Sequence, residues 1–169
     1  MKYIFSKTLL TLTLFSSLSQ AGGDAMYSFL GLQVSSSEYE DISTQTVAIK
    51  YGQQSAMWRT AISYNFAQNS DNKMQSLIAQ IDHGILTEMF ETLPVKPYIG
   101  FSIGVMEHKN NMNAVSTDRG YLYGLNGGIN YVINDKVDID LGYRYMKTTN
   151  LESIDKVNDA MLSLHYYFQ

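Results

Sequence analysis

Six charged side chains occupy equivalent positions in an alternating pattern of apolar and polar residues, and they are the strongest candidates for chemistry in this sequence. Each lies in the polar phase of its segment. They are three bases and three aspartates: Lys50, Arg59, Arg144, Asp82, Asp138 and Asp140. If this phase lines an enclosed interior, the charges must be paired, because a buried charge without a partner costs several kcal/mol. The sequence therefore predicts a charge-balanced network inside the fold.

Arg59 and Asp82 are the best-placed pair of this network. A turn expected near Ser70 would bring them opposite each other across a hairpin. Two roles for the network stay open: a structural plug that fills the interior, or a gate whose pairs exchange partners to pass ions. A narrow interior favours the plug. His165 lies in the same phase and could join the network or titrate near neutral pH, but we expect it only to fill space.

Eight segments position these residues, and most of them alternate with a period of two. Successive side chains of a strand point to opposite faces, so this period predicts β-strands. In the last segment, Leu162, Leu164 and Tyr166 share one phase, while Ser163 and His165 lie in the other. The first segment is apolar in both phases, so its register stays open. The expected strands are 26–35, 45–51, 58–66, 76–85, 97–105, 121–131, 137–145 and 160–168.

The composition of the two phases indicates what each face contacts. The polar phase is mainly Gly, Ser, Asn, Ala and Gln, whereas water-exposed surfaces carry roughly 25–35% charged residues. The apolar phase has aliphatic residues in the middle of the strands and aromatic residues at both ends, as in barrels surrounded by lipid. One predicted aromatic belt consists of Tyr51, Trp58, Tyr131, Tyr166 and Phe168. The other consists of Tyr64, Phe66, Tyr121, Tyr123, Tyr143 and Tyr145.

These patterns predict an all-β fold, an eight-stranded antiparallel up-and-down transmembrane β-barrel. A soluble barrel is the alternative, because Tyr and Phe favour strands in any environment. The connections support the membrane barrel, since short turns at 52–56 and 134–136 contrast with longer polar loops at 36–44, 107–120 and 148–157. Two connections fit less well. Residues 68–72 are few for an outer loop, and 86–94 are many for an inner turn and could hold a helical turn.

The N-terminal residues have the layout of a secretory signal peptide. Lys2 and Lys7 precede an apolar stretch, and Ser19-Gln20-Ala21 offers small residues for cleavage. We expect residues 1–21 to be the signal peptide and 22–169 to form one barrel domain. The signal holds two lysines and no acids, so its removal changes the formal net charge from −4 to −6. This acidic net charge offers no basic surface for binding nucleic acid. The absence of cysteine excludes disulfides and thiolate sites.

Two segments resemble a known family. Residues 97–105, PYIGFSIGV, and 137–145, VDIDLGYRY, resemble strands of the OmpA-like, OmpX-like and Opa-like outer-membrane β-barrel proteins, often called the porin family. The resemblance implies a place in the cell outer membrane, insertion by the barrel-assembly machinery, and contact with outer-membrane lipid and lipopolysaccharide. In the family the last residue is usually the aromatic, whereas Gln169 follows Phe168 here. The chain ends with the barrel, so we do not expect a cell-wall tether.

Catalytic constellations do not emerge from the sequence. Lipid A deacylases of this size use a His-x-Ser pair, and none of His83, His108 and His165 has a serine two residues later. Glu38, Glu40 and Asp41 form an acidic cluster best explained as solvated loop charge. No phosphate-binding, zinc-protease or calcium-loop motif is present, so we expect no metal and no cofactor.

The resulting functional prediction is a structural or surface-interaction barrel without catalysis. Its outer loops would meet the exterior, and host or surface ligands are the expected partners. A small diffusion channel for ions or solutes is the main alternative. A lipid A-modifying enzyme and a soluble periplasmic barrel are weaker alternatives.

Overall fold

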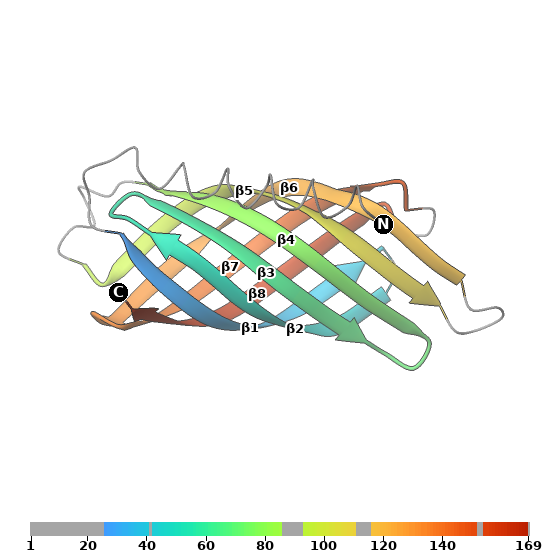
Figure 1. The fold of residues 1–169 in the computed structure, drawn as a ribbon, viewed down its shortest axis with the longest axis horizontal. Coiled ribbons are helices and arrows are strands. Elements are labelled where there is room, and N and C mark those ends of the chain that lie inside the picture. Colours follow the sequence, from blue (N-terminus) through green and yellow to red (C-terminus); the bar gives the residue numbers. More distant parts are fainter. Residues whose placement is uncertain (1–25, 41, 86–92, 111–115, 152–153, 169) are drawn as a thin grey trace, which may run out of the picture.

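Eight antiparallel strands close into a barrel in the computed structural model, which describes residues 26–40, 42–85, 93–110, 116–151 and 154–168 (Figure 1). The predicted fold class is therefore confirmed. Residues 1–21, the expected signal peptide, lie outside the described residues, and its cleavage stays a prediction. The strands are β1 (Tyr27–Tyr39), β2 (Ile42–Gln54), β3 (Trp58–Gln68), β4 (Asn72–Gly84), β5 (Val95–Asn110), β6 (Ser116–Asn134), β7 (Val137–Thr149) and β8 (Lys156–Phe168).

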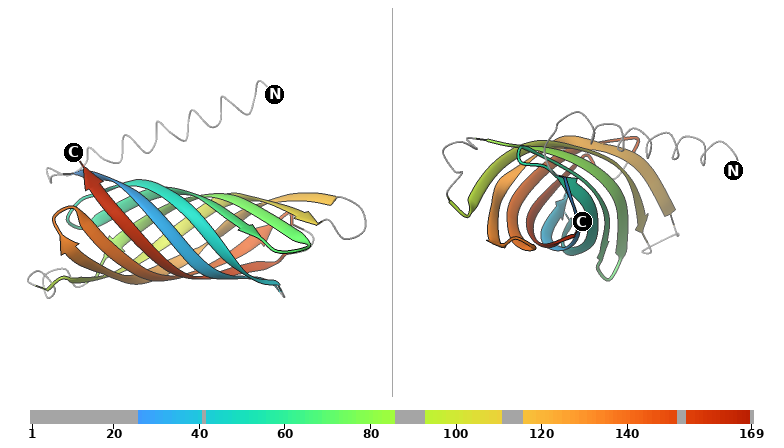
Figure 2. Two further views of the ribbon diagram at one scale, coloured as in Figure 1. Left: turned by 90° about the horizontal axis from the view of Figure 1, so that it is seen from below. Right: turned by 60° about the vertical axis from the view of Figure 1, so that its left-hand side comes forward.

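Each strand pairs with its sequence neighbours, and β1 pairs with β8 to close the sheet. The left view of Figure 2 shows β1 and β8 side by side. Leu32 of β1 lies opposite Leu164 of β8 in this closing ladder. Closure leaves no strand edge with unpaired backbone groups, which is the condition for strands to cross a bilayer. No helix of the described ranges is long and apolar enough to cross a membrane.

The two faces of the barrel follow the predicted phases. Leu32, Leu141 and Tyr121 point outward and are 65%, 62% and 60% exposed. A water-soluble barrel would bury such side chains, so a wall this apolar fits lipid. The register of β1 is now resolved: Phe29 is buried inside against the rings of His165 and Tyr167, which turns the leucines and valine of β1 outward.

The barrel has two distinct ends. We call the end with the first residue of β1 and the last residue of β8 the terminal end, and the opposite end the distal end (Figure 1). The β2–β3 and β6–β7 turns lie at the terminal end, while the β1–β2, β3–β4, β5–β6 and β7–β8 connections lie at the distal end. In the left view of Figure 2, β5 and β6 project farthest at the distal end.

Several connections are shorter than the sequence predicted. β5 continues to Asn110 and β6 begins at Ser116, so most of the expected loop 107–120 is strand. β1, β2, β7 and β8 likewise extend into the expected loops 36–44 and 148–157. Backbone pairing continues beyond the point where outward side chains stop being apolar. The predicted strands ended where this pattern ended, so they were too short. The helical turn expected within 86–94 falls mainly on residues 86–92, outside the described residues.

The short β3–β4 connection is a tight turn held by one side chain. The Oδ1 atom of Asn69 accepts hydrogen bonds from the amides of Asp71 and Asn72, at 3.1 and 2.8 Å. Asn favours such turns because its side chain can replace a backbone acceptor. The turn sets the register that brings Arg59 of β3 opposite Asp82 of β4.

The interior contains two zones of different character. The half near the terminal end is lined by charged and polar side chains. The half near the distal end holds an apolar cluster, which we call the distal cluster. Its members are Tyr39, Ala67, Met74, Ile78, Met106, Leu122, Met146, Leu151, Ile154 and Val157.

Candidate functional site: a polar network inside the barrel

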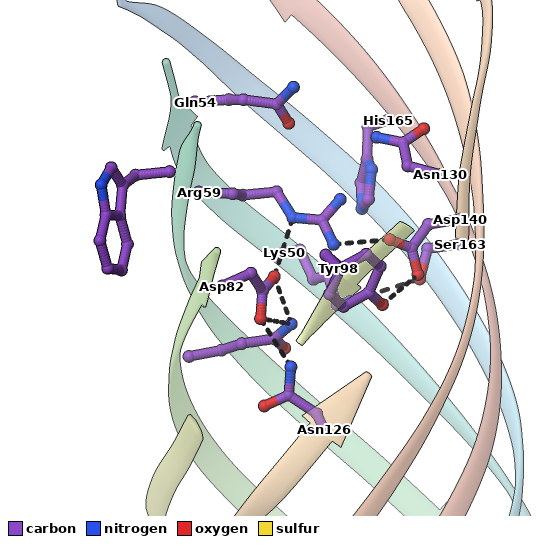
Figure 3. Close-up of polar contacts among 12 residues, drawn as sticks. Lys50, Gln54, Arg59, Asp82, Tyr98, Asn126, Asn130, Asp140, Ser163 and His165 are labelled. Atoms are coloured by element: carbon purple, nitrogen blue, oxygen red, sulfur yellow. Dashed lines mark hydrogen bonds and ion pairs between the residues drawn. The ribbon is translucent and has the colours of Figure 1, made fainter. Parts of the chain in front are cut away.

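Arg59 is the centre of the polar half of the interior. Its Nε donates to Asp82 Oδ2 at 2.9 Å, and its Nη2 donates to Asp140 Oδ2 at 2.6 Å (Figure 3). All three side chains are buried. Asp82 lies on the neighbouring strand β4, whereas Asp140 lies on β7 across the interior. The Arg59 guanidinium therefore links the β3–β4 side of the wall to β7, with which these strands share no backbone pairing, through charge-assisted hydrogen bonds.

The two carboxylates have further donors from the surrounding strands. Asp82 also accepts hydrogen bonds from the amides of Gln80 and Asn126, the latter at 2.6 Å. Asp140 accepts one from the hydroxyl of Tyr98 at 2.9 Å. The ring of Tyr98 lies 4.5 Å from the Arg59 guanidinium carbon, a cation–π distance. Each of these three charges therefore has several partners, as the enclosure of ions in a low-dielectric interior requires, while Arg59 Nη1 and Gln80 Oε1 have no hydrogen-bond partner among the described residues.

Lys50 lies in the same zone without joining an ion pair. Its ammonium donates to the hydroxyl of Ser163 at 3.3 Å. No carboxylate of the described residues lies within ion-pair distance of Lys50, so this prediction of pairing is wrong for Lys50. Lys50 is buried in the interior, and its charge interacts electrostatically with Asp140 and Arg59 without direct contact.

Asp138 and His165 form a second pair near the terminal end. The Nδ1 of His165 lies 2.7 Å from Asp138 Oδ1, because the β7–β8 register places the two residues opposite each other. Asn130 donates to the other oxygen of Asp138 at 2.6 Å, and the hydroxyl of Tyr167 donates to it as well. The expectation that His165 only fills space is therefore wrong. Residue type alone does not reveal this pair, because the β7–β8 register decides it.

Arg144 has a partner that the sequence reasoning missed. Its Nε and Nη2 both donate to Asp159 Oδ2, at 2.9 and 2.5 Å, and the two residues are opposite each other in the β7–β8 register. Asp159 lies in the inward phase of β8, but the predicted strand began one residue later. The described interior therefore holds a fourth aspartate, and the predicted equality of three bases and three acids does not hold.

The residues of both predicted aromatic belts point outward. Tyr51, Trp58, Tyr131, Tyr166 and Phe168 lie toward the terminal end, and Tyr64, Phe66, Tyr121, Tyr123, Tyr143 and Tyr145 toward the distal end. Three other aromatic side chains of the described residues, Phe29, Tyr39 and Tyr98, are buried inside, and Tyr167 is half-buried there. Alternation alone did not single them out.

The family model described as the outer membrane protein beta-barrel domain matches residues 8–168. The chain belongs to this family. The predicted resemblance and the location in the outer membrane are confirmed by this match. In outer-membrane barrels short turns face the periplasm and longer loops face outward. The two short turns β2–β3 and β6–β7 lie at the terminal end, although the longer β4–β5 connection lies there too. We therefore treat the terminal end as periplasmic and the distal end as extracellular, and this orientation stays a prediction.

Solved structures show the same fold at low sequence identity. Neisserial surface protein A is 20% identical over 87% of this chain and 100% of its own, with a TM-score of 0.69. The N-terminal barrel domain of Pseudomonas aeruginosa OprF is 12% identical over 83% of this chain and 97% of its own, with a TM-score of 0.63. The outer membrane enzyme PagL is 11% identical over 82% and 98%, with a TM-score of 0.50. No curated protein sequence matches the chain.

The histidines of this outer-membrane barrel have structural surroundings. The ring of His83 contacts that of Trp58 at a tilt of 49°, with centroids 4.4 Å apart, and His108 Nε2 lies 2.8 Å from the side-chain oxygen of Asn72. No group of three or more metal-ligating side chains occurs in the described part of the chain. In the acidic cluster Glu38 accepts from Asn158 at 3.4 Å and Glu40 lies 3.9 Å from Lys156, while Asp41 falls outside the described residues.

Proposed function

We propose that this protein is a non-catalytic structural and surface-interaction barrel whose interior is closed. The observation that carries the proposal is that two successive zones of buried side chains fill the interior beyond a cavity of about 350 Å³ at its terminal mouth. The ion-pair network occupies the periplasmic half, and the distal cluster occupies the extracellular half. Of the two roles left open by the sequence, these contacts support the plug.

A diffusing ion would meet two different obstacles in this barrel. It would first have to displace Arg59 from Asp82 and Asp140, which hold it with short charge-assisted bonds. It would then have to cross the distal cluster, where Met74 and Met146 are 2% and 1% exposed. Hydrophobic constrictions exclude water and therefore oppose conduction. The alternative of a diffusion channel needs both obstacles to open.

The extracellular end supports surface display. A transmembrane strand needs about 9–11 residues, whereas β5 and β6 have 16 and 19. The β5–β6 hairpin therefore extends beyond the bilayer, and we propose that it and the neighbouring connections contact host or surface ligands. Lipopolysaccharide around the barrel and the barrel-assembly machinery during insertion are the further partners of this proposal.

Planar-bilayer recording tests the closed interior. We expect the purified, folded protein to give no reproducible conductance. The variant Arg59→Gln removes the central cation and should remain silent if the distal cluster also seals the barrel, while a combined Arg59→Gln and Met146→Ser variant should conduct more readily. Reproducible wild-type openings that change in Arg59→Gln would support the channel instead.

Loop replacement tests surface display separately. Exchange of residues 111–117 for a Gly-Ser linker should leave the heat-dependent shift on SDS gels unchanged, because that shift reports the folded barrel. The same exchange should reduce adhesion of cells to a host surface. Loss of insertion would contradict passive display, and release of fatty acid from lipid A by the purified protein would contradict the absence of catalysis.

A further inference from the structure

The outer wall of β3 to β6 changes from apolar to cationic in three successive rows toward the extracellular end. Neighbours within each row are opposite each other in the strand register. The first row, which of the three lies nearest the bilayer centre, is Tyr64, Leu77, Val105 and Tyr121. The second row is Phe66, Gln75, Glu107 and Arg119. The third row is Gln68, Lys73, Lys109 and Thr117.

A groove of about 520 Å³ lies over the first two rows. Apolar side chains form its floor, and Glu107 and Arg119 border it on the extracellular side. Arg119 is bound to Glu107 through Nη2 at 2.6 Å, yet its side chain is 76% exposed. The groove is thus amphipathic along the membrane normal, with an apolar surface below and a cation above.

The cations of this wall are placed against each other. Lys73 of β4 lies directly opposite Lys109 of β5, and Lys147 of β7 lies directly opposite Lys156 of β8. Like charges in directly opposed positions destabilise a sheet. Two such pairs toward the distal end of one barrel are unfavourable unless an anion lies between the strands.

The chain itself neutralises these cations only in part. Lys109 lies 3.1 Å from Glu107, and Lys156 lies 3.9 Å from Glu40. Lys73 is placed over the ring of Phe66 at 5.4 Å, and no carboxylate of the described residues is within ion-pair distance of it or of Lys147. The outward rows of β4 to β8 carry five cations beside one carboxylate, Glu107, and Glu40 next to β1 is a second carboxylate within reach of Lys156. This excess of cations contrasts with the formal net charge of −4 of the whole chain.

We propose that this wall binds the phosphorylated headgroup of an outer-leaflet lipid, with the acyl chains lying along the apolar floor. The inference rests on the outer-membrane location and deepens the proposed contact with lipopolysaccharide. A lipid fits better than a free anion, because the floor of the groove is continuous with the lipid-facing band and only an amphiphile satisfies both parts. The phosphates would separate the opposed lysines and pair with Arg119.

The test compares lipids retained by the folded protein. The full chain is reconstituted into phosphatidylcholine nanodiscs that contain bisphosphorylated lipid A, and the lipids released with the barrel are counted by native mass spectrometry. A matched sample contains dephosphorylated lipid A. We expect preferential retention of the phosphorylated form. A cation at a membrane surface contributes a factor of about five in affinity, so Lys73→Gln with Arg119→Gln should reduce retention about 25-fold.

Lys96 and Lys136 provide the matched control, because both are exposed at the periplasmic end. Lys96→Gln with Lys136→Gln changes the net charge equally and should leave retention unchanged. Equal retention of both forms of lipid A by the wild type would overturn the proposal without any substitution, even if a variant failed to fold. Full competition by inorganic phosphate would also overturn it, since the site would then recognise a free anion. Failure here leaves the closed interior untouched, because conductance does not depend on this wall.

Discussion

Replacement of Arg59 by methionine is the most direct test of the interior network. Methionine keeps much of the length and the apolar stem of the side chain while removing the guanidinium. Asp82 would keep its bonds from Gln80 and Asn126, but Asp140 would keep only the hydroxyl of Tyr98 among the contacts described above. The variant therefore leaves two buried carboxylates without their shared cation.

The expected loss of unfolding free energy follows from these contacts. Removing one partner of a buried pair costs about 3–5 kcal/mol, because the remaining charge stays buried. Two carboxylates are affected here, which argues for the upper part of that range. A cavity of about 40 Å³ next to Arg59 and Asp82 offers room for a water molecule that would hydrate them, which argues for the lower part. We expect a loss of about 3 kcal/mol.

Urea unfolding in phospholipid vesicles, followed by the fluorescence of Trp58, measures this loss. Trp58 is the single tryptophan of the chain and lies beside Arg59 on the lipid-facing side. Lys136→Met, on an exposed turn, should change stability by less than about 0.5 kcal/mol. Asp140→Asn should cost less in the Arg59→Met background than in the wild type. A loss below about 1 kcal/mol in Arg59→Met, together with additive effects in the double variant, would refute the account of the network.

Three further predictions concern the strands around this network. Gly100→Ala should destabilise the barrel by about 2 kcal/mol or more in urea, because a Cβ there would collide with the Asp82 carboxylate. Gly127→Ala is the control: at this lipid-facing position the nearest atom to a Cβ would be 3.3 Å away, so the loss should be smaller. Met146→Ala should cost about 2–5 kcal/mol in the same assay, since this side chain is 1% exposed in the distal cluster. In this cysteine-free chain, an impermeant thiol reagent added to cells should label Gln75→Cys and spare Leu77→Cys; the reverse order would misplace the membrane boundary.

The fold was predictable from the sequence because its dominant signal is local. A period of two needs only neighbouring residues, and it assigned the inward and outward phases of β2 to β8 correctly. The first strand shows the limit of this signal. Both of its phases are apolar, and only the contact of Phe29 with His165 of β8, far away in the sequence, decides which one faces inward.

The network was predictable in composition and less so in its pairs. Arg59 and Asp82 belong to one hairpin, so counting from the turn was sufficient to place them opposite each other. Asp140 reaches Arg59 across the interior, and such a contact depends on barrel shear and on long side chains, which strand phase does not encode. Asp159 was missed for a simpler reason, since the strand was predicted to begin at residue 160.

The distal cluster reveals a reversal of polarity that a single alternation rule cannot describe. In β4, Gln80 and Asp82 point inward and Leu77 points outward, but nearer the extracellular end Met74 points inward and Lys73 points outward. The phase of the strand is unchanged, whereas the chemistry of its two faces is exchanged. Within the bilayer the outside is hydrocarbon, so the outward side chains must be apolar and the interior can accept polar groups.

Beyond the bilayer the outside is water and lipid headgroups, so the strands pack as those of a soluble barrel do, with an apolar core and a charged surface. The point of exchange lies between Leu77 and Gln75 on β4 and between Val105 and Glu107 on β5, which are neighbouring positions in the register. The same boundary therefore explains three features of the structure. Beyond this boundary the distal cluster fills the interior. The strands continue past the stretch in which outward side chains are apolar, and the cations lie on the outer wall.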